Sequence, residues 1–131
     1  MTRDQQRAMA APQITPETRE FWAAATEGRL AIGRCSRCRE AHFYPRAHCP
    51  FCFSPETSLE TASGAGWIYS YSVPRAPVPF AIALVTLAEG PTIMTNIVDC
   101  DLNSLAIGQP VRLIFRLSEA GQKVPVFTPA A

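Results

Sequence analysis

Four cysteines in two closely spaced pairs are the residues of this 131-residue chain that point most directly to a specific chemistry. The first pair is Cys35 and Cys38, and the second is Cys49 and Cys52. Each Cys-x-x-Cys turn presents two sulfurs to one ion, and Zn²⁺ prefers a tetrahedron of ligands in which thiolates are well suited. The spacing therefore predicts one zinc site formed by these four residues.

Two other roles are open to the same four cysteines. Two disulfides would require an oxidising compartment, but no apolar stretch typical of a signal peptide lies near the N-terminus, so we expect a cytoplasmic protein. A redox-active Cys-x-x-Cys motif normally occurs singly and beside a βαβ pattern. Zinc is therefore favoured, and a closed shell of four thiolates leaves no position for water or substrate, which predicts a structural metal.

The residues around the cysteines give two further expectations. His42 and His48 lie between the pairs, and with four thiolates available we interpret both as surface residues. Arg39 and Phe53 follow the second cysteine of each pair, where glycine is common because it adopts positive φ easily. The backbone at these two positions is therefore expected to be strained or differently turned.

Composition limits the classes of protein to consider. Apolar residues make up 47% of the chain, enough for a real core, and the formal net charge is +1, which predicts no strong attraction to nucleic acid or to a membrane surface. No apolar run approaches the roughly 20 residues that span a bilayer. The fifth cysteine, Cys100, is interpreted as a buried structural thiol.

The order of patterns divides the chain into four parts. Residues 1–13 have no periodicity and are expected to form a flexible tail. An N-terminal helix is expected within residues 14–28, with Thr15 as its N-cap and Gly28 as its stop. Residues 29–62 contain the cysteines and predict a zinc ribbon, and residues 63–131 follow a β pattern.

The β pattern predicts five short strands. Turn signals separate them, and no helical run between them is long enough for a parallel crossover. The expected strands are residues 67–73, 80–87, 92–98, 111–117 and 123–128. The second is almost continuously apolar, which predicts burial on both faces. The fold class is therefore mainly β: an N-terminal helix, a rubredoxin-like zinc ribbon, and a C-terminal five-stranded OB-fold barrel.

The order of motifs also resembles a known family. The helix and the Cys-x-x-Cys ribbon are followed by LVTLAEGP at residues 84–91, TNIVDCD at 95–101 and IGQPV at 107–111. These features are similar to those of the acyl-CoA-associated zinc-ribbon/OB-fold proteins, long catalogued as a domain of unknown function. The resemblance covers residues 14–129, nearly the whole chain.

The resemblance implies an accessory subunit rather than an enzyme. Members of that family accompany thiolases and thiolase-like aldolases and help to complete a pocket for an acyl-CoA thioester. The residues of this chain agree with an accessory role, because no nucleophile with an adjacent base is recognisable in the sequence. Arg75, in the proline-rich loop 74–79, is the candidate for acyl-CoA contact, although a solvated loop arginine is the alternative. Phe21 and Trp22 share one helix face, either as core or as a partner surface. Docking is expected to depend on Trp22 or Phe80.

Single-stranded nucleic-acid binding is the alternative function, because zinc ribbons and OB folds both serve it. Trp67, Tyr69 and Tyr71 could stack on bases, and Arg112 and Arg116 could contact phosphates. The near-neutral net charge and the absence of a Lys/Arg run count against this alternative.

Overall fold

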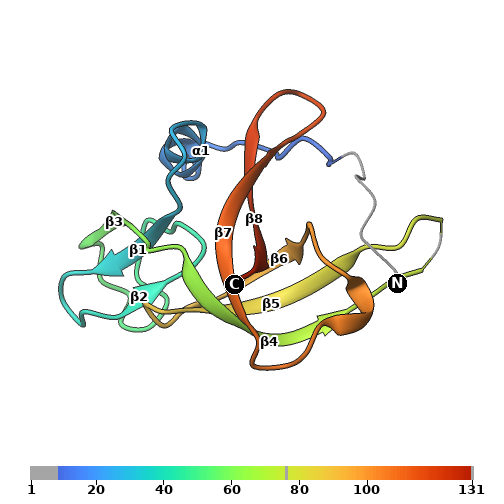
Figure 1. Ribbon diagram of the computed structural model, residues 1–131. Helices are drawn as coiled ribbons and strands as arrows, with labels where there is room; N and C mark the ends of the chain where they lie inside the picture. The colour runs from blue at the N-terminus through green and yellow to red at the C-terminus, as the bar shows by residue number, and fades with distance from the viewer. Residues whose placement is uncertain (1–8, 76, 131) are drawn as a thin grey trace.

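The computed structural model describes residues 9–75 and 77–130 and consists mainly of strands (Figure 1). The one α-helix among them is α1 (Arg19–Thr26), and a short 3₁₀ helix, η1, spans Leu102–Ser104. Three strands form a small sheet: β1 (Ala31–Cys35), β2 (Ala41–His42) and β3 (Thr57–Thr61). Five form a barrel: β4 (Ala65–Ser72), β5 (Ala81–Leu87), β6 (Thr92–Ile97), β7 (Pro110–Leu117) and β8 (Lys123–Pro129). Within the described residues, no helix has the length and apolar character needed to cross a membrane.

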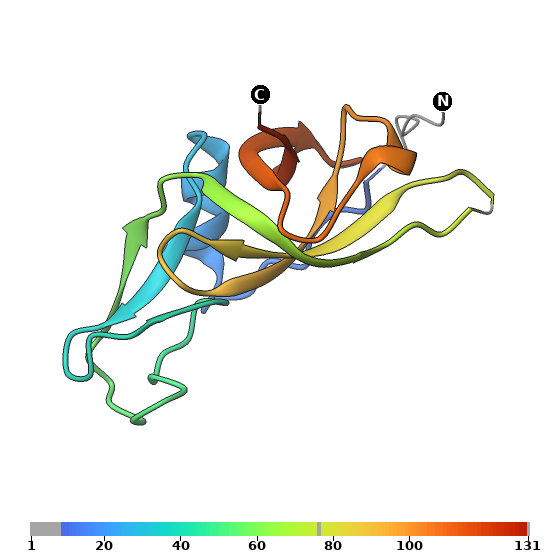
Figure 2. The ribbon, with the colours of Figure 1, turned by 60° about the horizontal axis from the view of Figure 1, so that its bottom comes forward.

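The barrel has the predicted five strands and is closed. Its strand order is β4-β5-β6-β8-β7, and β7 returns to pair with β4. All neighbouring pairs are antiparallel except β6 and β8, which run parallel. The three-stranded sheet β2-β1-β3 extends from one end of this barrel (Figure 2). The mainly β architecture expected from the sequence is thereby confirmed.

Strand β5 corrects one expectation about burial. The apolar run at residues 80–87 predicted burial on both faces, but β5 alternates strictly between buried and half-buried residues. Ala81, Ala83, Val85 and Leu87 face the barrel interior and are at most 1% exposed. The prediction was wrong because a strand of a closed barrel has only one face inside, so the other face can be apolar without being covered.

Helix α1 begins three residues later than predicted. Thr15 does not cap it: the N–H of Thr18 donates to the Thr15 carbonyl at 3.0 Å, which makes a turn, and Thr18 is the N-cap. The predicted stop at Gly28 is confirmed, with φ of +83°. The N–H groups of Gly28 and Arg29 donate to the carbonyls of Ala25 and Ala24, both at 2.9 Å, which is a Schellman ending.

The two helix aromatics lie in the core of the chain itself. Phe21 is 2% exposed and Trp22 is 8% exposed, and their rings meet edge to face with centroids 4.9 Å apart. Phe21 also contacts Phe43 and Tyr44 of the ribbon, at centroid distances of 5.6 and 5.0 Å. Such aromatic contacts add to the stabilisation from burial. The expectation that Trp22 anchors a partner is therefore wrong, because its surface is already covered within the chain.

Helix, ribbon and barrel are joined by one continuous core and by polar ties. The buried apolar cluster includes residues of α1, of β1 and of the barrel strands. The amide of Gln122, in the β7–β8 turn, donates to the Trp22 carbonyl at 3.1 Å, and Glu17 accepts from the Ala47 N–H at 2.9 Å. Of the predicted tail, residues 1–8 lie outside the described residues, whereas Met9 accepts from the Glu119 N–H at 2.9 Å. The helix thus connects the ribbon to the barrel.

Truncating Trp22 should destabilise the isolated chain. We expect Trp22→Ala to lower the free energy of unfolding by about 3 kcal/mol, because it leaves a cavity in the shared core. Trp67→Ala, which truncates a Trp that is 44% exposed, is the matched control and should cost about 1 kcal/mol or less. Urea unfolding followed by circular dichroism measures both variants, and equal losses would contradict the placement of Trp22 in the core.

Candidate metal centre

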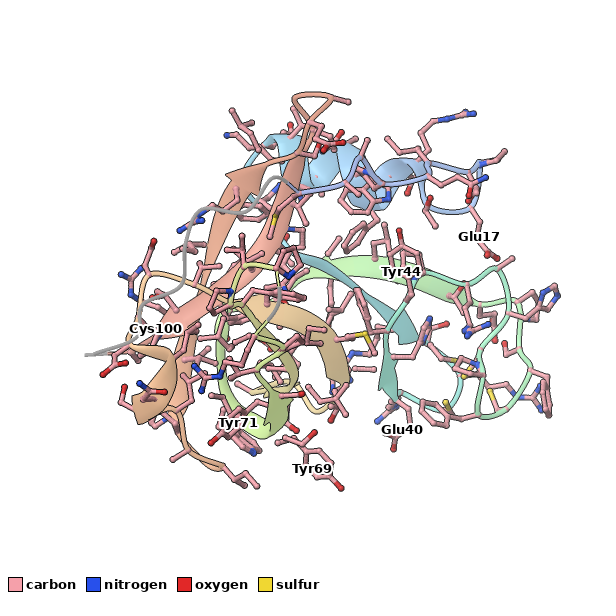
Figure 3. All side chains as sticks on the ribbon, turned by 90° about the vertical axis from the view of Figure 1, so that its right-hand side faces the viewer. Glu17, Glu40, Tyr44, Tyr69, Tyr71 and Cys100 are labelled. Carbon is pink, nitrogen blue, oxygen red and sulfur yellow. The ribbon has the colours of Figure 1, made fainter. Side chains whose placement is uncertain are left out.

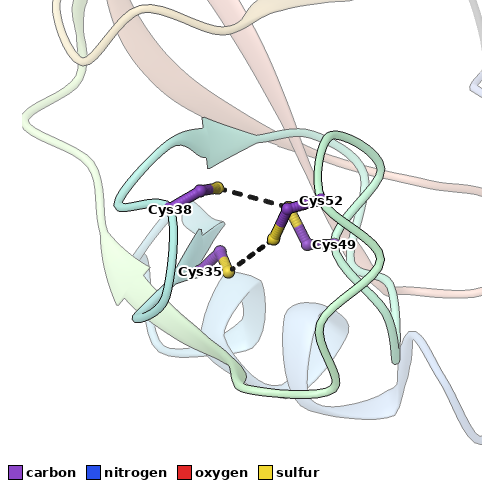
Figure 4. A group of neighbouring side chains, drawn as sticks. All are labelled: Cys35, Cys38, Cys49 and Cys52. Atoms are coloured by element: carbon purple, nitrogen blue, oxygen red, sulfur yellow. Dashed lines mark hydrogen bonds between the residues drawn. The ribbon is translucent and has the colours of Figure 1, made fainter.

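The sulfurs of the four predicted cysteines meet at one point in the ribbon (Figure 4). Two sulfur pairs, Cys35–Cys52 and Cys38–Cys49, are each 3.6 Å apart, and all four sulfurs lie within 4.8 Å of one another. Four Zn–S bonds of about 2.3 Å in a tetrahedron require sulfurs about 3.8 Å apart. The arrangement therefore fits a zinc ion, and the separation is far longer than the roughly 2 Å of a disulfide bond.

The two Cys-x-x-Cys turns are built alike. In the first, Cys35 accepts from the Arg39 N–H at 2.8 Å and donates its own N–H to Glu40 at 3.1 Å. In the second, Cys49 accepts from the Phe53 N–H at 2.9 Å and donates to the Ser54 carbonyl at 2.9 Å. These bonds close each turn around its pair of sulfurs.

The backbone after each turn is left-handed, as the missing glycines suggested. Arg39 has φ of 67° and Phe53 has φ of 64°. A left-handed conformation at a residue other than glycine costs of the order of 1 kcal/mol, and it persists only where the surrounding structure imposes it. The hydrogen bonds that close the turns impose it here.

An ion pair holds the first turn against the sheet. The guanidinium of Arg34 on β1 donates to Glu60 on β3 through Nε at 3.0 Å and Nη2 at 2.7 Å. Its Nη1 donates to the Arg39 carbonyl at 2.8 Å, so the same side chain ties the turn to both strands. The hydrogen bond with Glu60 also raises the pKa of Arg34. These contacts hold the first turn, which carries Cys35 and Cys38, against β1 and β3.

The four thiols differ in burial, and the pKa values of Cys35 and Cys38 are shifted in opposite directions. Cys35 and Cys49 are buried, whereas Cys38 and Cys52 are half-buried. The Cys38 amide lowers the pKa of the Cys35 thiol to about 6. The Glu40 amide lowers the pKa of Cys38, but burial and hydrogen bonds with neighbouring thiols such as Cys49 outweigh it and raise that pKa to about 12. Metal binding at such a site releases the remaining thiol protons.

His42 was expected on the surface but is buried. It is 3% exposed, and neither ring nitrogen has a hydrogen-bond partner among the described residues. Its ring lies over Gly33 on the neighbouring strand, so closely that a Cβ at Gly33 would come within 2.1 Å of Nε2. Burial, and secondarily the charge of Arg46, lowers the pKa of His42. The pattern Gly33 opposite His42 was the missed signal, because only glycine leaves room for the ring.

The other predicted residues lie apart from the cysteines. His48 is exposed, as expected, and Cys100 is buried, as expected. Arg75 belongs to the β4–β5 connection, which lies at the end of the barrel opposite the ribbon (Figure 2). Its Nη2 donates to Asn103 of η1 at 3.1 Å. The structure therefore brings the four cysteines together but does not add Arg75 to their site.

Comparison with known proteins bears on this arrangement directly. Residues 22–58 match the family model described as the ChsH2 rubredoxin-like zinc ribbon domain, and residues 59–116 match the ChsH2 C-terminal OB-fold domain. A DUF35 domain-containing scaffold protein of Methanothermobacter thermautotrophicus is 37% identical over 95 residues, which cover 66% of this chain and 71% of the relative. The chain belongs to the DUF35 family. The resemblance identified from the sequence motifs is confirmed, as is a zinc ribbon with four clustered cysteines able to hold a zinc ion.

Two further relatives carry enzyme names. The chain of a solved structure titled Ltp2-ChsH2(DUF35) aldolase is 35% identical with a TM-score of 0.83; the match covers 92% of our chain and 100% of that one. A probable enoyl-CoA hydratase alpha subunit of Thermomonospora curvata is 34% identical over 125 residues. That match covers 91% of this chain but only 39% of the relative. DUF35 proteins of this kind therefore occur both as separate chains and as parts of longer ones.

Loss of one cysteine should abolish stable zinc binding. We expect one zinc per chain in the wild type, and loss of most of it from Cys38→Ser after dialysis against a competing chelator, because three thiolates cannot close the tetrahedron. Cys100→Ala is the matched control, since it removes a buried thiol outside the cluster and should keep its zinc. A colorimetric zinc indicator measures the zinc content of each protein. Full zinc content in Cys38→Ser would contradict the assignment of the four cysteines to one zinc ion.

The buried His42 should make stability depend on pH. Its folded pKa is lowered, so the unfolded chain binds the proton more readily, and the stability contributed by neutral His42 is present above the ordinary histidine pKa of about 6.5 and lost as the pH falls below it. We expect the stability difference between wild type and His42→Gln to shrink from pH 7 to pH 5. His48→Gln, which changes an exposed histidine, should show no such trend. Denaturant unfolding across this range tests it, and a constant difference would contradict the burial of an unpaired ring.

Proposed function

We propose that this chain is a non-catalytic accessory subunit that docks on a thiolase-like or aldolase partner and helps it to bind an acyl-CoA thioester. One observation carries the proposal: the likeness to the chain titled Ltp2-ChsH2(DUF35) aldolase covers all of that chain and 92% of this one. The scaffold name of the Methanothermobacter thermautotrophicus relative supports the same role. A fold alone would not, because OB barrels host many functions.

The chemistry of the described residues supports a helper rather than a catalyst. Acyl transfer needs a nucleophile beside a base, an oxyanion hole or a metal with an open position. Four thiolates leave a zinc ion no open position. His42 is buried over Gly33, and His48 is exposed in the second turn, next to Cys49. We therefore assign Cys35, Cys38, Cys49 and Cys52 to a structural zinc ion.

Arg75 remains our candidate for contact with the CoA moiety. It is exposed in the proline-rich β4–β5 connection, and its hydrogen bond to Asn103 holds the guanidinium against η1. A guanidinium binds phosphate oxygens through paired N–H donors. We propose that it contacts a CoA phosphate when the chain and its partner are assembled.

The test measures the activity of the partner with and without this chain. We expect a thiolase-like or aldolase protein from the same source organism to associate with this chain at micromolar concentration and to have a lower KM for its acyl-CoA substrate in the complex. Within the complex, Arg75→Ala should raise that KM several-fold, whereas Arg19→Ala, which removes an exposed arginine of α1, should not. A partner that is fully active alone and does not associate would disprove the proposal, as would thioester turnover by this chain in isolation.

A further inference from the structure

The outward side chains of three neighbouring barrel strands form a surface without charge. Strands β4, β5 and β6 contain no Asp, Glu, Lys, Arg or His, whereas β7 and β8 carry Arg112, Arg116 and Lys123. A solvated face of an antiparallel sheet is normally polar, and charged side chains are its usual covering. We call the outward side of β4–β6 the uncharged face.

Large apolar and aromatic side chains are exposed on this face. Met94 is 73% exposed, Tyr69 61% and Trp67 44%. Tyr69 lies at the irregularity in the β4–β5 register between Ile68 and Ser70, and it projects away from the barrel (Figure 3). Tyrosine, tryptophan and methionine are the residue types that are enriched in the centres of protein interfaces, where charged residues are depleted.

The strand register makes these residues neighbours rather than scattered points. Leu84 on β5 lies opposite Met94 on β6 on one side and opposite Ser70 on β4 on the other. In the next outward row, Thr86 lies between Trp67 and Thr92. The exposed apolar side chains thus lie on three adjacent strands, with uncharged serine and threonine side chains between them, and exposed apolar surface of this kind marks interaction sites.

Three polar side chains on the face are hydrogen-bonded within the chain. The hydroxyls of Thr86 and Thr92 are 3.0 Å apart and bond to each other, and the amide of Asn96 donates to the Ala81 carbonyl at 2.9 Å. Beside them lies a shallow hollow of about 390 Å³, lined by Phe80, Ile82, Met94, Thr95 and Asn96. These bonded groups lose less hydration than free polar groups when they are covered, and the hollow can receive an apolar side chain.

From this we infer that the uncharged face is the surface on which the thiolase-like partner docks, through an apolar, uncharged surface of its own. The inference rests on the proposed function and adds the location of the docking surface on this chain. The absence of cations disfavours nucleic acid, which needs Lys or Arg beside the stacking aromatics. Of the two arginines considered for that role, Arg116 is paired with Asp99, and Arg112 stands on β7, outside the face.

The test compares substitutions on the uncharged face with a substitution outside it. Met94→Glu and Tyr69→Ser should each weaken binding to the thiolase-like or aldolase protein from the same source organism at least tenfold in isothermal calorimetry. Leu117→Glu is the matched control, because it changes an apolar residue of β7 that is 65% exposed. Its affinity for the partner should stay within twofold of the wild-type affinity. Zinc content and thermal unfolding establish that each variant is folded, and Tyr69→Ser keeps the test valid should Met94→Glu not fold.

Each remaining outcome overturns the inference in a distinguishable way. If the wild type binds and both face variants bind equally well, the location is wrong while the proposed function stands. The same holds if Phe53→Glu, in the exposed second turn, weakens binding and the face variants do not. If sedimentation shows that the wild type forms a dimer that Met94→Glu dissociates, the occupant is a second copy. If the wild type does not bind the partner at all, the proposed function fails together with the inference.

Discussion

The ribbon depends on four sulfurs being held at the corners of one tetrahedron. It has only three short strands, one of them two residues long, and such a segment buries too little apolar surface to be stable alone. A metal held by Cys35, Cys38, Cys49 and Cys52 would supply the missing free energy. Because β1 leads from the first turn into the core shared with α1 and the barrel, that stabilisation would extend beyond the ribbon.

The buried groups that hold the fold together are separate from the exposed surface that we propose for a partner. The aromatic cluster around Phe21 and the barrel interior are turned inward, and the four cysteines of the ribbon are buried or half-buried. The outward side of β4–β6 is left uncharged and exposed. An accessory subunit needs this division, since a partner surface must be present on a structure that is already rigid, so that little entropy is lost on binding.

The sequence predicted the parts of the fold that follow from local chemistry. Cysteine spacing identified the metal centre, Gly28 the end of the helix, and the strand pattern the closed five-stranded barrel. At Arg39 and Phe53, where glycine is common, the sequence predicted either strain or a different turn, and the positive φ of both residues decides for strain. The cysteine turns and the helix end are decided by residues close together in the chain, whereas the barrel was inferred from the number and spacing of its strands.

The predictions that were wrong concern whether a side chain is buried or exposed after folding. Trp22 could be assigned to the core or to a partner from its helix, and only the packing of Phe43 and Tyr44 against its neighbour Phe21 decides for the core. The sequence predicted His42 on the surface, but the pairing of β2 with β1 places its ring over Gly33. Such contacts join distant segments, and periodicity carries no information about them.

The central claim, that this chain assists a reaction without performing it, is tested most directly by the structure of its complex with the thiolase-like partner and an acyl-CoA. The account predicts that the thioester carbonyl contacts only groups of the partner within hydrogen-bonding distance, and that the uncharged face of this chain is buried against that partner. A side chain of this chain placed as nucleophile, base or oxyanion donor at the thioester would contradict it.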